Sequence, residues 1–181
     1  MEKMITWGFY FILTIALLSA AIILYQKAQA SYKETAAMSE VTSIVSGAEA
    51  LYSGQPAYTG LTNTLMINAE KIPDNIITDA ASGTITNPWG GQIVVACDDA
   101  APASGLNTPS PAYFDVDLSG LPKGACIQLA TGFSTGNFQG VNINGTIFPS
   151  IANGGAQITP AQADAACSNG SNGNTLSFAF N

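Results

Sequence analysis

The sequence of 181 residues contains no histidine and no arginine, and only 9% of its residues are charged. Without histidine there is no imidazole base for a serine or cysteine nucleophile, and without arginine there is no guanidinium to hold a phosphate. Five lysines face twelve acids, so the net charge of −7 does not suit the phosphate backbone of nucleic acids. We therefore expect neither an enzyme nor a protein whose globular part contacts nucleic acid.

Charge is absent altogether from residues 4–26, close to the N-terminus. About 20 apolar residues at roughly 1.5 Å each span a hydrocarbon core about 30 Å thick, so this stretch predicts a membrane-spanning helix. A cleavable secretory signal is the alternative, since Ala28-Gln29-Ala30 matches an A-x-A cleavage site. The length of the apolar run and the missing basic front, where Glu2 and Lys3 cancel, argue against a signal.

The helical pattern continues beyond the apolar stretch. Apolar residues recur at spacings of three and four from Val41 to Tyr52, and no proline interrupts residues 1–55. The sequence therefore predicts one helix over residues 1–54, about 75 to 80 Å long. Its first half, 1–26, is apolar on all sides and suits a bilayer or a bundle of identical helices, whereas 27–54 is amphipathic and is expected to pack on a globular head.

The remaining residues predict a connector and a small head of mixed α and β structure. Residues 55–84 form the connector, with a short helix near Leu65–Lys71. Residues 85–181 form the head, where the last strand is expected inside the sheet and the turn pair Asn144-Gly145 bends or splits the third strand. The expected strands cover residues 92–96, 112–118, 141–148 and 176–180.

Two helices are expected in the head. One covers residues 121–131, with Ser119 as a candidate cap. The other follows Thr159-Pro160-Ala161-Gln162, where threonine, proline and glutamine have the spacing of a capping box.

Three cysteines, Cys97, Cys126 and Cys167, accompany the apolar front. In an exported protein this number indicates one disulfide and one remaining thiol, rather than a metal site. Spacing alone does not choose the pair. For Cys97 we favour a buried thiol, with a reactive thiol or an intersubunit link as alternatives.

Carboxylates cluster at Asp98-Asp99 and at Asp115-Val116-Asp117. Oxygen-rich loops of this kind bind calcium, which is one interpretation of these acids. We favour the other interpretation, in which they are solvated acids of a loop and of a strand face. The sequence therefore predicts no metal site, and nothing in it indicates a cofactor.

Short strings spread over nearly the whole chain form an ordered set: Ser39-Glu40-Val41, Gly47 to Gln55, Tyr58-Thr59-Gly60-Leu61, Ile72-Pro73-Asp74-Asn75, Ile85 to Gly91, Ala125 to Thr131, Gly140-Val141-Asn142-Ile143 and Thr159 to Ala163. The set resembles that of the type IVb pilins. The resemblance implies the α+β pilin fold, with a long N-terminal helix and a head built on a twisted, mostly antiparallel sheet. It also implies a disulfide between Cys126 and Cys167 that closes the C-terminal region.

The resemblance implies a structural function as well. Subunits of this family wait in the inner membrane with the head in the periplasm, and meet a prepilin peptidase and the pilus assembly machinery. They then form an extracellular homopolymer whose core is made of N-terminal helices, and which serves adhesion, aggregation or conjugation. The alternatives are a secreted or anchored monomeric binding domain and a pseudopilin of type II secretion. The expected filament-core packing residues are Trp7, Phe9, Phe11, Ile12, Ile15, Leu18 and Ile22.

The front of the chain departs from the family pattern. The basic leader that ends in glycine is absent, so we expect Met1 to be the first mature residue. The family's glutamate at the fifth mature position is replaced by Ile5, or by Thr6 in an ungapped comparison. We expect Glu2 to pair instead with the amino group of Met1 in a neighbouring subunit, because a buried unpaired charge is costly; a place at the membrane surface is the alternative.

Overall fold

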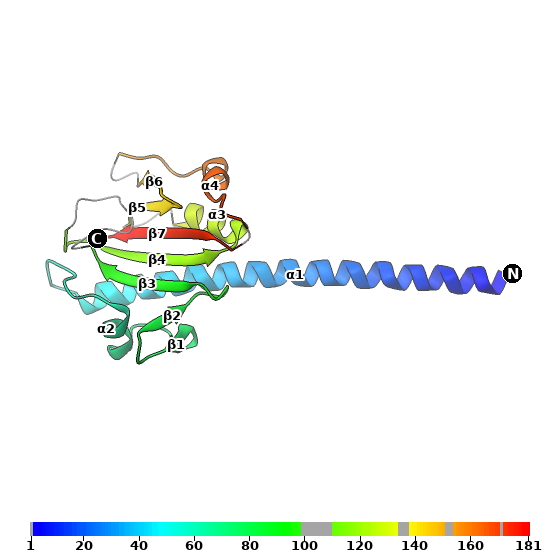
Figure 1. Ribbon diagram of the computed structural model, residues 1–181, viewed down its shortest axis with the longest axis horizontal. Helices are drawn as coiled ribbons and strands as arrows, with labels where there is room; N and C mark the ends of the chain where they lie inside the picture. The colour runs from blue at the N-terminus through cyan, green and yellow to red at the C-terminus, as the bar shows by residue number, and fades with distance from the viewer. Residues whose placement is uncertain (1, 99–109, 134–137, 151–153, 171) are drawn as a thin grey trace.

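A computed structural model describes residues 2–98, 110–133, 138–150, 154–170 and 172–181, with the backbone alone for residues 2–6 and 8–11. Helix α1, Glu2–Leu51, projects from a small head as a straight rod, with the N-terminus at its far end (Figure 1). The helix is continuous, as the absence of proline predicts. It ends at Leu51, where the chain turns through Gly54 at a φ of 84°.

The two halves of α1 have different surroundings. Every side chain from residue 12 to residue 32 is exposed, although most of them are apolar. Within the head, one face of the same helix is buried against the sheet, at the three-and-four spacing that the sequence shows. The fully buried residues of this face are Ala37, Val41, Ile44 and Ala48.

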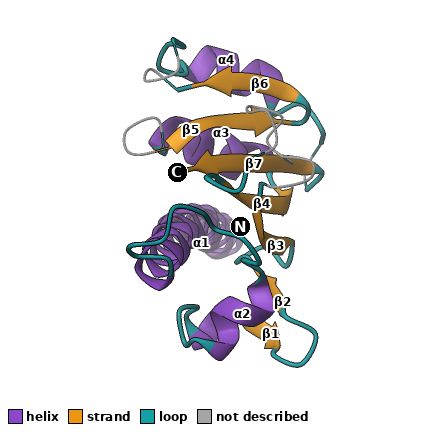
Figure 2. Cartoon of the chain, turned by 90° about the vertical axis from the view of Figure 1, so that its left-hand side faces the viewer, coloured by secondary structure: helices purple, strands orange, loops and turns teal. Residues whose placement is uncertain are grey.

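The head contains a seven-stranded sheet in which all neighbours are antiparallel, in the order β1-β2-β3-β4-β7-β5-β6 (Figure 2). The C-terminal strand β7 lies inside the sheet between β4 and β5, as the sequence predicts. The strands are β1 Ile77–Asp79, β2 Thr84–Thr86, β3 Gln92–Cys97, β4 Phe114–Leu121, β5 Phe138–Ile143, β6 Thr146–Pro149 and β7 Asn174–Phe180. The fold is thus the expected α+β arrangement, but β1 and β2 were not expected from the sequence.

Short helices complete the head: α2 Asn63–Asn68, the 3-10 turn η1 Asp74–Ile76, α3 Lys123–Gly132 and α4 Pro160–Ala166. Helix α2 starts earlier than expected, because the hydroxyl of Thr62 accepts a hydrogen bond from the backbone of Leu65 at 3.2 Å and caps it. At α4 the predicted capping box is present, with Thr159 and Gln162 bonded to each other's backbone at 2.9 and 3.3 Å.

Ser119 does not cap α3, which corrects the sequence prediction. It lies in β4, where its hydroxyl accepts a hydrogen bond from the backbone of Gln92 at 2.9 Å, and Pro122 occupies the cap position without a side-chain bond. The turn pair after β5 forms a hairpin. Asn144 and Gly145 have φ values of 51° and 89°, as a tight turn with two left-handed residues requires.

The core lies between the sheet and two helices, α1 and α3, on one face of the sheet (Figure 2). Alternate residues of β4 and β7 point into it, with Phe114, Val116 and Leu118 opposite Phe180, Phe178 and Leu176. Aromatic contacts link the sheet to the residue after α1: the ring centroids of Phe114 and Tyr58 are 4.6 Å apart, and those of Tyr58 and Tyr52 are 5.3 Å apart. The head therefore holds the second half of α1 firmly and leaves the first half without a partner.

Candidate functional site

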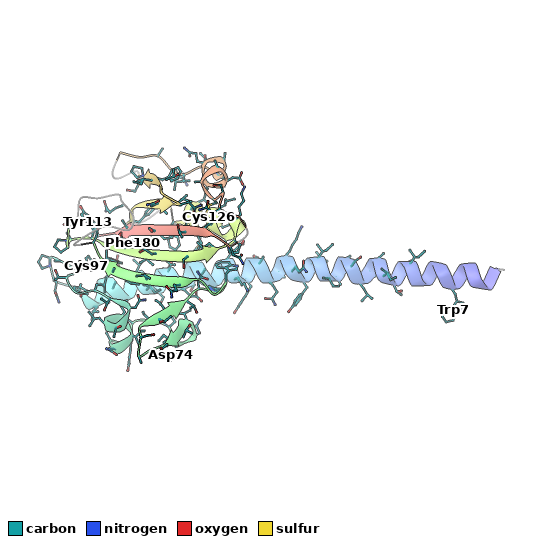
Figure 3. All side chains as sticks on the ribbon, in the orientation of Figure 1. Trp7, Asp74, Cys97, Tyr113, Cys126 and Phe180 are labelled. Carbon is teal, nitrogen blue, oxygen red and sulfur yellow. A yellow bond between two sulfur atoms is a disulfide. The ribbon has the colours of Figure 1, made fainter. Side chains whose placement is uncertain are left out.

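The exposed apolar half of α1 is the most extended surface of its kind on the described residues. Side chains radiate from it on all sides, and no other element approaches them (Figure 3). Trp7, labelled near its end, is 79% exposed. Ile12, Ile15, Leu18 and Ile22 are exposed too, so the expected packing residues that the structure describes are free to contact a bilayer or another helix. Met1 and the side chains of Glu2, Phe9 and Phe11 lie outside the described residues.

A disulfide joins Cys126 in α3 to Cys167 at the end of α4. Their Cα atoms are 6.0 Å apart, and both side chains are fully buried. The bond closes a segment that contains the β5–β6 hairpin and α4, so the C-terminal region of the head is tied into a single unit. Cys97 is not part of a disulfide, and it is half-buried at the end of β3 rather than fully buried.

Two asparagines support this closed region through side-chain hydrogen bonds that the sequence did not predict. The Asn144 side chain donates to the carbonyl of Ala166 at 2.8 Å and to the side-chain oxygen of Asn174 at 2.9 Å. Asn174 is fully buried and donates to the carbonyl of Leu121 at 3.0 Å. A buried side-chain amide does not destabilise a protein when its hydrogen-bonding groups have partners. The hydrogen bonds of Asn144 and Asn174 link the end of α4, the end of β4 and the start of β7.

The clustered acids are not arranged as expected. Asp98 and Asp115 are almost fully buried, at 1% and 2% exposed, so they are not solvated acids; Asp99 lies outside the described residues. Asp117, on the same face of β4 as Asp115, is half-buried. Within the described ranges, no three Cys, Asp or Glu side chains are placed to hold a metal ion.

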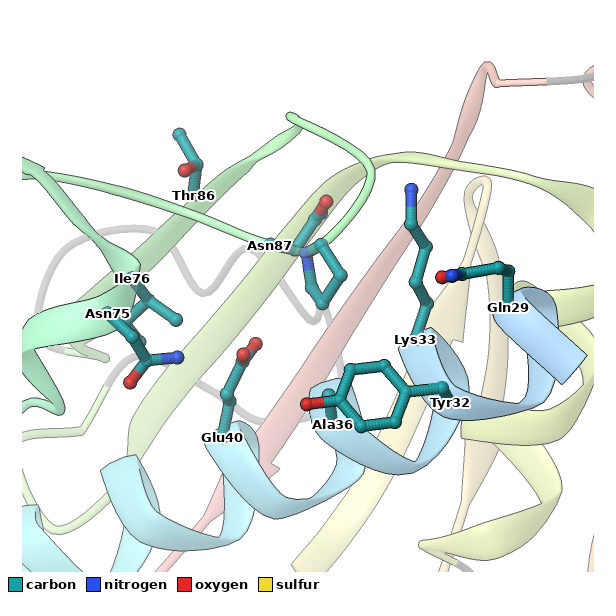
Figure 4. A pocket seen from close by; sticks show the side chains of 10 residues that line it. Gln29, Tyr32, Lys33, Ala36, Glu40, Asn75, Ile76, Thr86 and Asn87 are labelled. Carbon is teal, nitrogen blue, oxygen red and sulfur yellow. The ribbon is translucent and has the colours of Figure 1, made fainter.

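A cleft of about 320 Å³ opens at the base of the head, where α1 leaves it (Figure 4). Four residues on one face of α1 form one wall: Gln29, Lys33, Ala36 and Glu40. Tyr32 lies at its rim, and the segment around Asn75, Ile76 and Asn87 forms the other wall. The sequence predicts no site here, because the two walls are more than 30 residues apart and neither has the residue pattern of a known binding site.

Comparison with known proteins identifies the family. Residues 31–181 match the family described as PilS N terminal. This chain belongs to the PilS family. The type IVb pilin of Salmonella typhi, known from a crystal structure, is 27% identical to it, with a TM-score of 0.62 over 81% of this chain and 99% of that one.

Two further relatives of this PilS-family pilin bear on its function and fold. The major structural subunit of the bundle-forming pilus of Escherichia coli O127:H6 is 39% identical over 164 residues, which cover 85% of this chain and 80% of that protein. TcpA, a type IV pilin from Vibrio cholerae El Tor, shares the fold with a TM-score of 0.59 at 14% identity, over 83% of this chain and 99% of that one.

Burial in this pilin raises the pKa of Asp117 to about 6. A hydrogen bond from Ser177 lowers this pKa, and the nearby charge of Asp115 raises it. Between about pH 4 and pH 6 the carboxyl group of Asp117 is therefore protonated in the folded chain but ionised in the unfolded chain. At neutral pH the folded chain must hold a charged, partly buried carboxylate, which destabilises the head. We expect Asp117→Asn to raise the free energy of unfolding by about 2 kcal/mol at pH 7, with little change at pH 4.

Denaturant unfolding of the full chain in detergent at both pH values measures this difference. Asp74→Asn removes the same charge from an exposed site and is the matched control. An effect of Asp117→Asn that is equal at pH 4 and pH 7 would contradict the assignment.

Proposed function

We propose that this PilS-family protein is the major structural subunit of a type IV pilus and that it polymerises through α1. The observation that carries the proposal is the run of exposed side chains from residue 12 to residue 32, on a helix long and apolar enough to cross a bilayer. A surface of this size is not stable in water, so it is covered by lipid in the membrane and by other copies of the same helix in a filament.

The division of the chain follows from this proposal. Residues 1–26 are the membrane and filament-core half of the helix, and 27–54 are the half that packs on the head. Residues 55–84 lead from the helix to the head proper, residues 85–181, and also contribute β1 and the first residue of β2 to its sheet. The partners are other copies of the chain, the inner membrane before assembly, a prepilin peptidase and the assembly machinery, and the final location is an extracellular filament. The 39% identity to a major pilus subunit favours this polymer over a monomeric binding domain.

The proposal can be tested on material sheared from cells. Electron microscopy shows whether this material contains filaments, and intact mass and N-terminal sequencing identify the chain that forms them. We expect uniform thin filaments made of chains that retain residues 4–26. A soluble monomer that begins near Ser31 would exclude the proposal, because the apolar stretch would then be a cleaved signal.

A substitution in the exposed half sharpens the test. Leu18→Asn replaces an apolar contact between helices by a polar side chain, and we expect it to reduce the filament yield strongly while the subunit still accumulates in the membrane fraction. Ile147→Asn makes the same type of change at an exposed position in β6 of the head and should leave the yield unchanged. Equal yields from both variants would contradict assembly through α1.

A further inference from the structure

Helix α1 carries aromatic side chains near both ends of its uncharged stretch. Trp7 and Tyr25 are both exposed, and their separation along the chain corresponds to about 27 Å of helix. This length matches a hydrocarbon core about 30 Å thick, and tryptophan and tyrosine are enriched where such a core meets water. The spacing therefore places the edge of the hydrocarbon next to Tyr25, on the side of the membrane that holds the head.

The base of the head lies close to this edge. Lipid headgroups fill roughly 5 to 8 Å beyond the hydrocarbon, and each residue of α1 adds about 1.5 Å, so Lys27 lies within the headgroup layer. Lys33, in the wall of the cleft (Figure 4), lies about 12 Å beyond Tyr25. A side chain added at Gly124 would meet the carboxylate of Glu34 at 3.7 Å, so the start of α3 lies at a similar height. The base is thus within about one Debye length, roughly 8 Å, of the headgroups.

Charge is distributed unevenly along the chain. Three of the five lysines lie at the base of the head or just below it: Lys27, Lys33 and Lys123. After Glu40, the chain carries eight acids besides Asp164, and Lys71 is the one further lysine there. An anionic surface therefore attracts the lysines of the base and repels most of the remaining head, which favours an orientation with the base toward the membrane.

The acids at the base are bonded within the chain or buried. Asp164 forms an ion pair with Lys123 at 2.7 Å. The carboxylate of Glu34 accepts a hydrogen bond from Gln128 of α3, and Glu40 is almost fully buried inside the cleft. These acids therefore leave the positive charge of α1 at the base largely uncompensated.

Two lysines of α1 provide that charge. Lys27 is exposed and Lys33 is half-buried, and neither forms an ion pair with a described residue. We propose that, before assembly, the base of the head rests on the headgroups of the membrane that α1 spans, and that Lys27 and Lys33 bind phosphate groups of anionic lipids there. The inference rests on the proposed function, because it needs the membrane-anchored stage. Tyr32 is exposed and lies between the two lysines in the sequence, where its amphipathic ring suits the same interface.

Acylation of lysine amines, measured for each residue by mass spectrometry, tests the contact. The full chain is inserted into vesicles of phosphatidylcholine, or of phosphatidylcholine mixed with phosphatidylglycerol, and treated with an uncharged acylating reagent. We expect the anionic vesicles to lower the reactivity of Lys27 and Lys33 about fivefold, because lipid phosphates hold these ammonium groups, and high salt to abolish the difference. Lys71, exposed after α2, is the internal control and should react equally in both vesicles.

Lys123 reports on the head rather than on the helix. Its reactivity should fall about twofold in anionic vesicles, because the base of the head is held at their surface. This fall should disappear in the Lys27→Gln/Lys33→Gln variant and persist in Lys71→Gln, which removes the same charge from a site away from the proposed contact. Reactivity of Lys123 in phosphatidylcholine vesicles should be the same for all three chains, which shows that the variants are folded.

The inference is overturned if Lys27 and Lys33 react equally in the two kinds of vesicle, if Lys71 is protected as well, or if the protection survives high salt. It is also overturned if Lys123 stays protected in the Lys27→Gln/Lys33→Gln variant. Filaments in material sheared from cells would leave the proposed function intact in each of these outcomes. A chain that does not insert into vesicles would count against both the inference and the proposed function.

Discussion

Replacing Cys126 and Cys167 together by serine is expected to lower the free energy of unfolding by about 2 to 5 kcal/mol. The disulfide closes a long segment, with a sequence separation of 41, and therefore restricts the unfolded chain strongly. Within the closed segment β5 is buried in the core, but β6 and much of α4 are exposed, so the disulfide supplements the few buried contacts of these two elements. Denaturant unfolding of the full chain in detergent measures the loss, and reduction of the wild type should reproduce it.

Cys97→Ser is the control for the disulfide prediction. It removes a thiol of similar size from a half-buried position without opening the closed segment. We expect a change of less than about 1 kcal/mol from this variant. A loss for the double serine variant that is no larger than the loss for Cys97→Ser would mean that the asparagine bonds and the capping box hold the C-terminal region without the disulfide.

Phe178→Ala is expected to cost about 3 to 5 kcal/mol of unfolding free energy. Phe178 is fully buried at the middle of β7, opposite Val116 of β4 and Val141 of β5. Its ring lies 4.9 Å from that of Phe133, which follows α3, so the side chain connects the sheet to the helix that carries Cys126. Truncation leaves a cavity between three elements that are held in place by other contacts, and such a cavity does not collapse.

Ile147→Ala in the edge strand β6 provides the comparison, since that side chain is 44% exposed and its truncation should cost about 0.5 kcal/mol or less. Unfolding in urea gives both values on one scale. A cost below about 1.5 kcal/mol for Phe178→Ala would indicate that the core around β7 relaxes to fill the space.

The parts of the fold that the sequence predicted are those set by local patterns. The long helix follows from the absence of proline and the three-and-four spacing from Val41 to Tyr52, the capping box of α4 from Thr159 and Gln162, and the hairpin from Asn144-Gly145. The place of β7 inside the sheet follows from its apolar face. Each of these patterns acts within a few residues and needs no knowledge of the rest of the chain.

The features that the sequence did not predict depend on contacts between residues far apart in the chain. Ser119 has the right chemistry for a helix cap, but its hydroxyl is occupied by Gln92 on the neighbouring strand. The burial of Asp98 and Asp115 depends on contacts with residues distant in the sequence, which no local pattern records. Glu40 has the spacing of the buried face of α1, yet only the fold places it in a cleft facing Asn75.

The continuity of α1 has a mechanical consequence. The same helix that would lie in the filament core passes without a break into the head, where Val41, Ile44 and Ala48 are fully buried against the sheet. Tension applied to a surface loop of the head would therefore reach the shaft through a rigid rod rather than through a flexible linker. Because one face of α1 is buried in the head, force along the long axis loads this wide apolar contact in shear and passes to the shaft without an intervening linker.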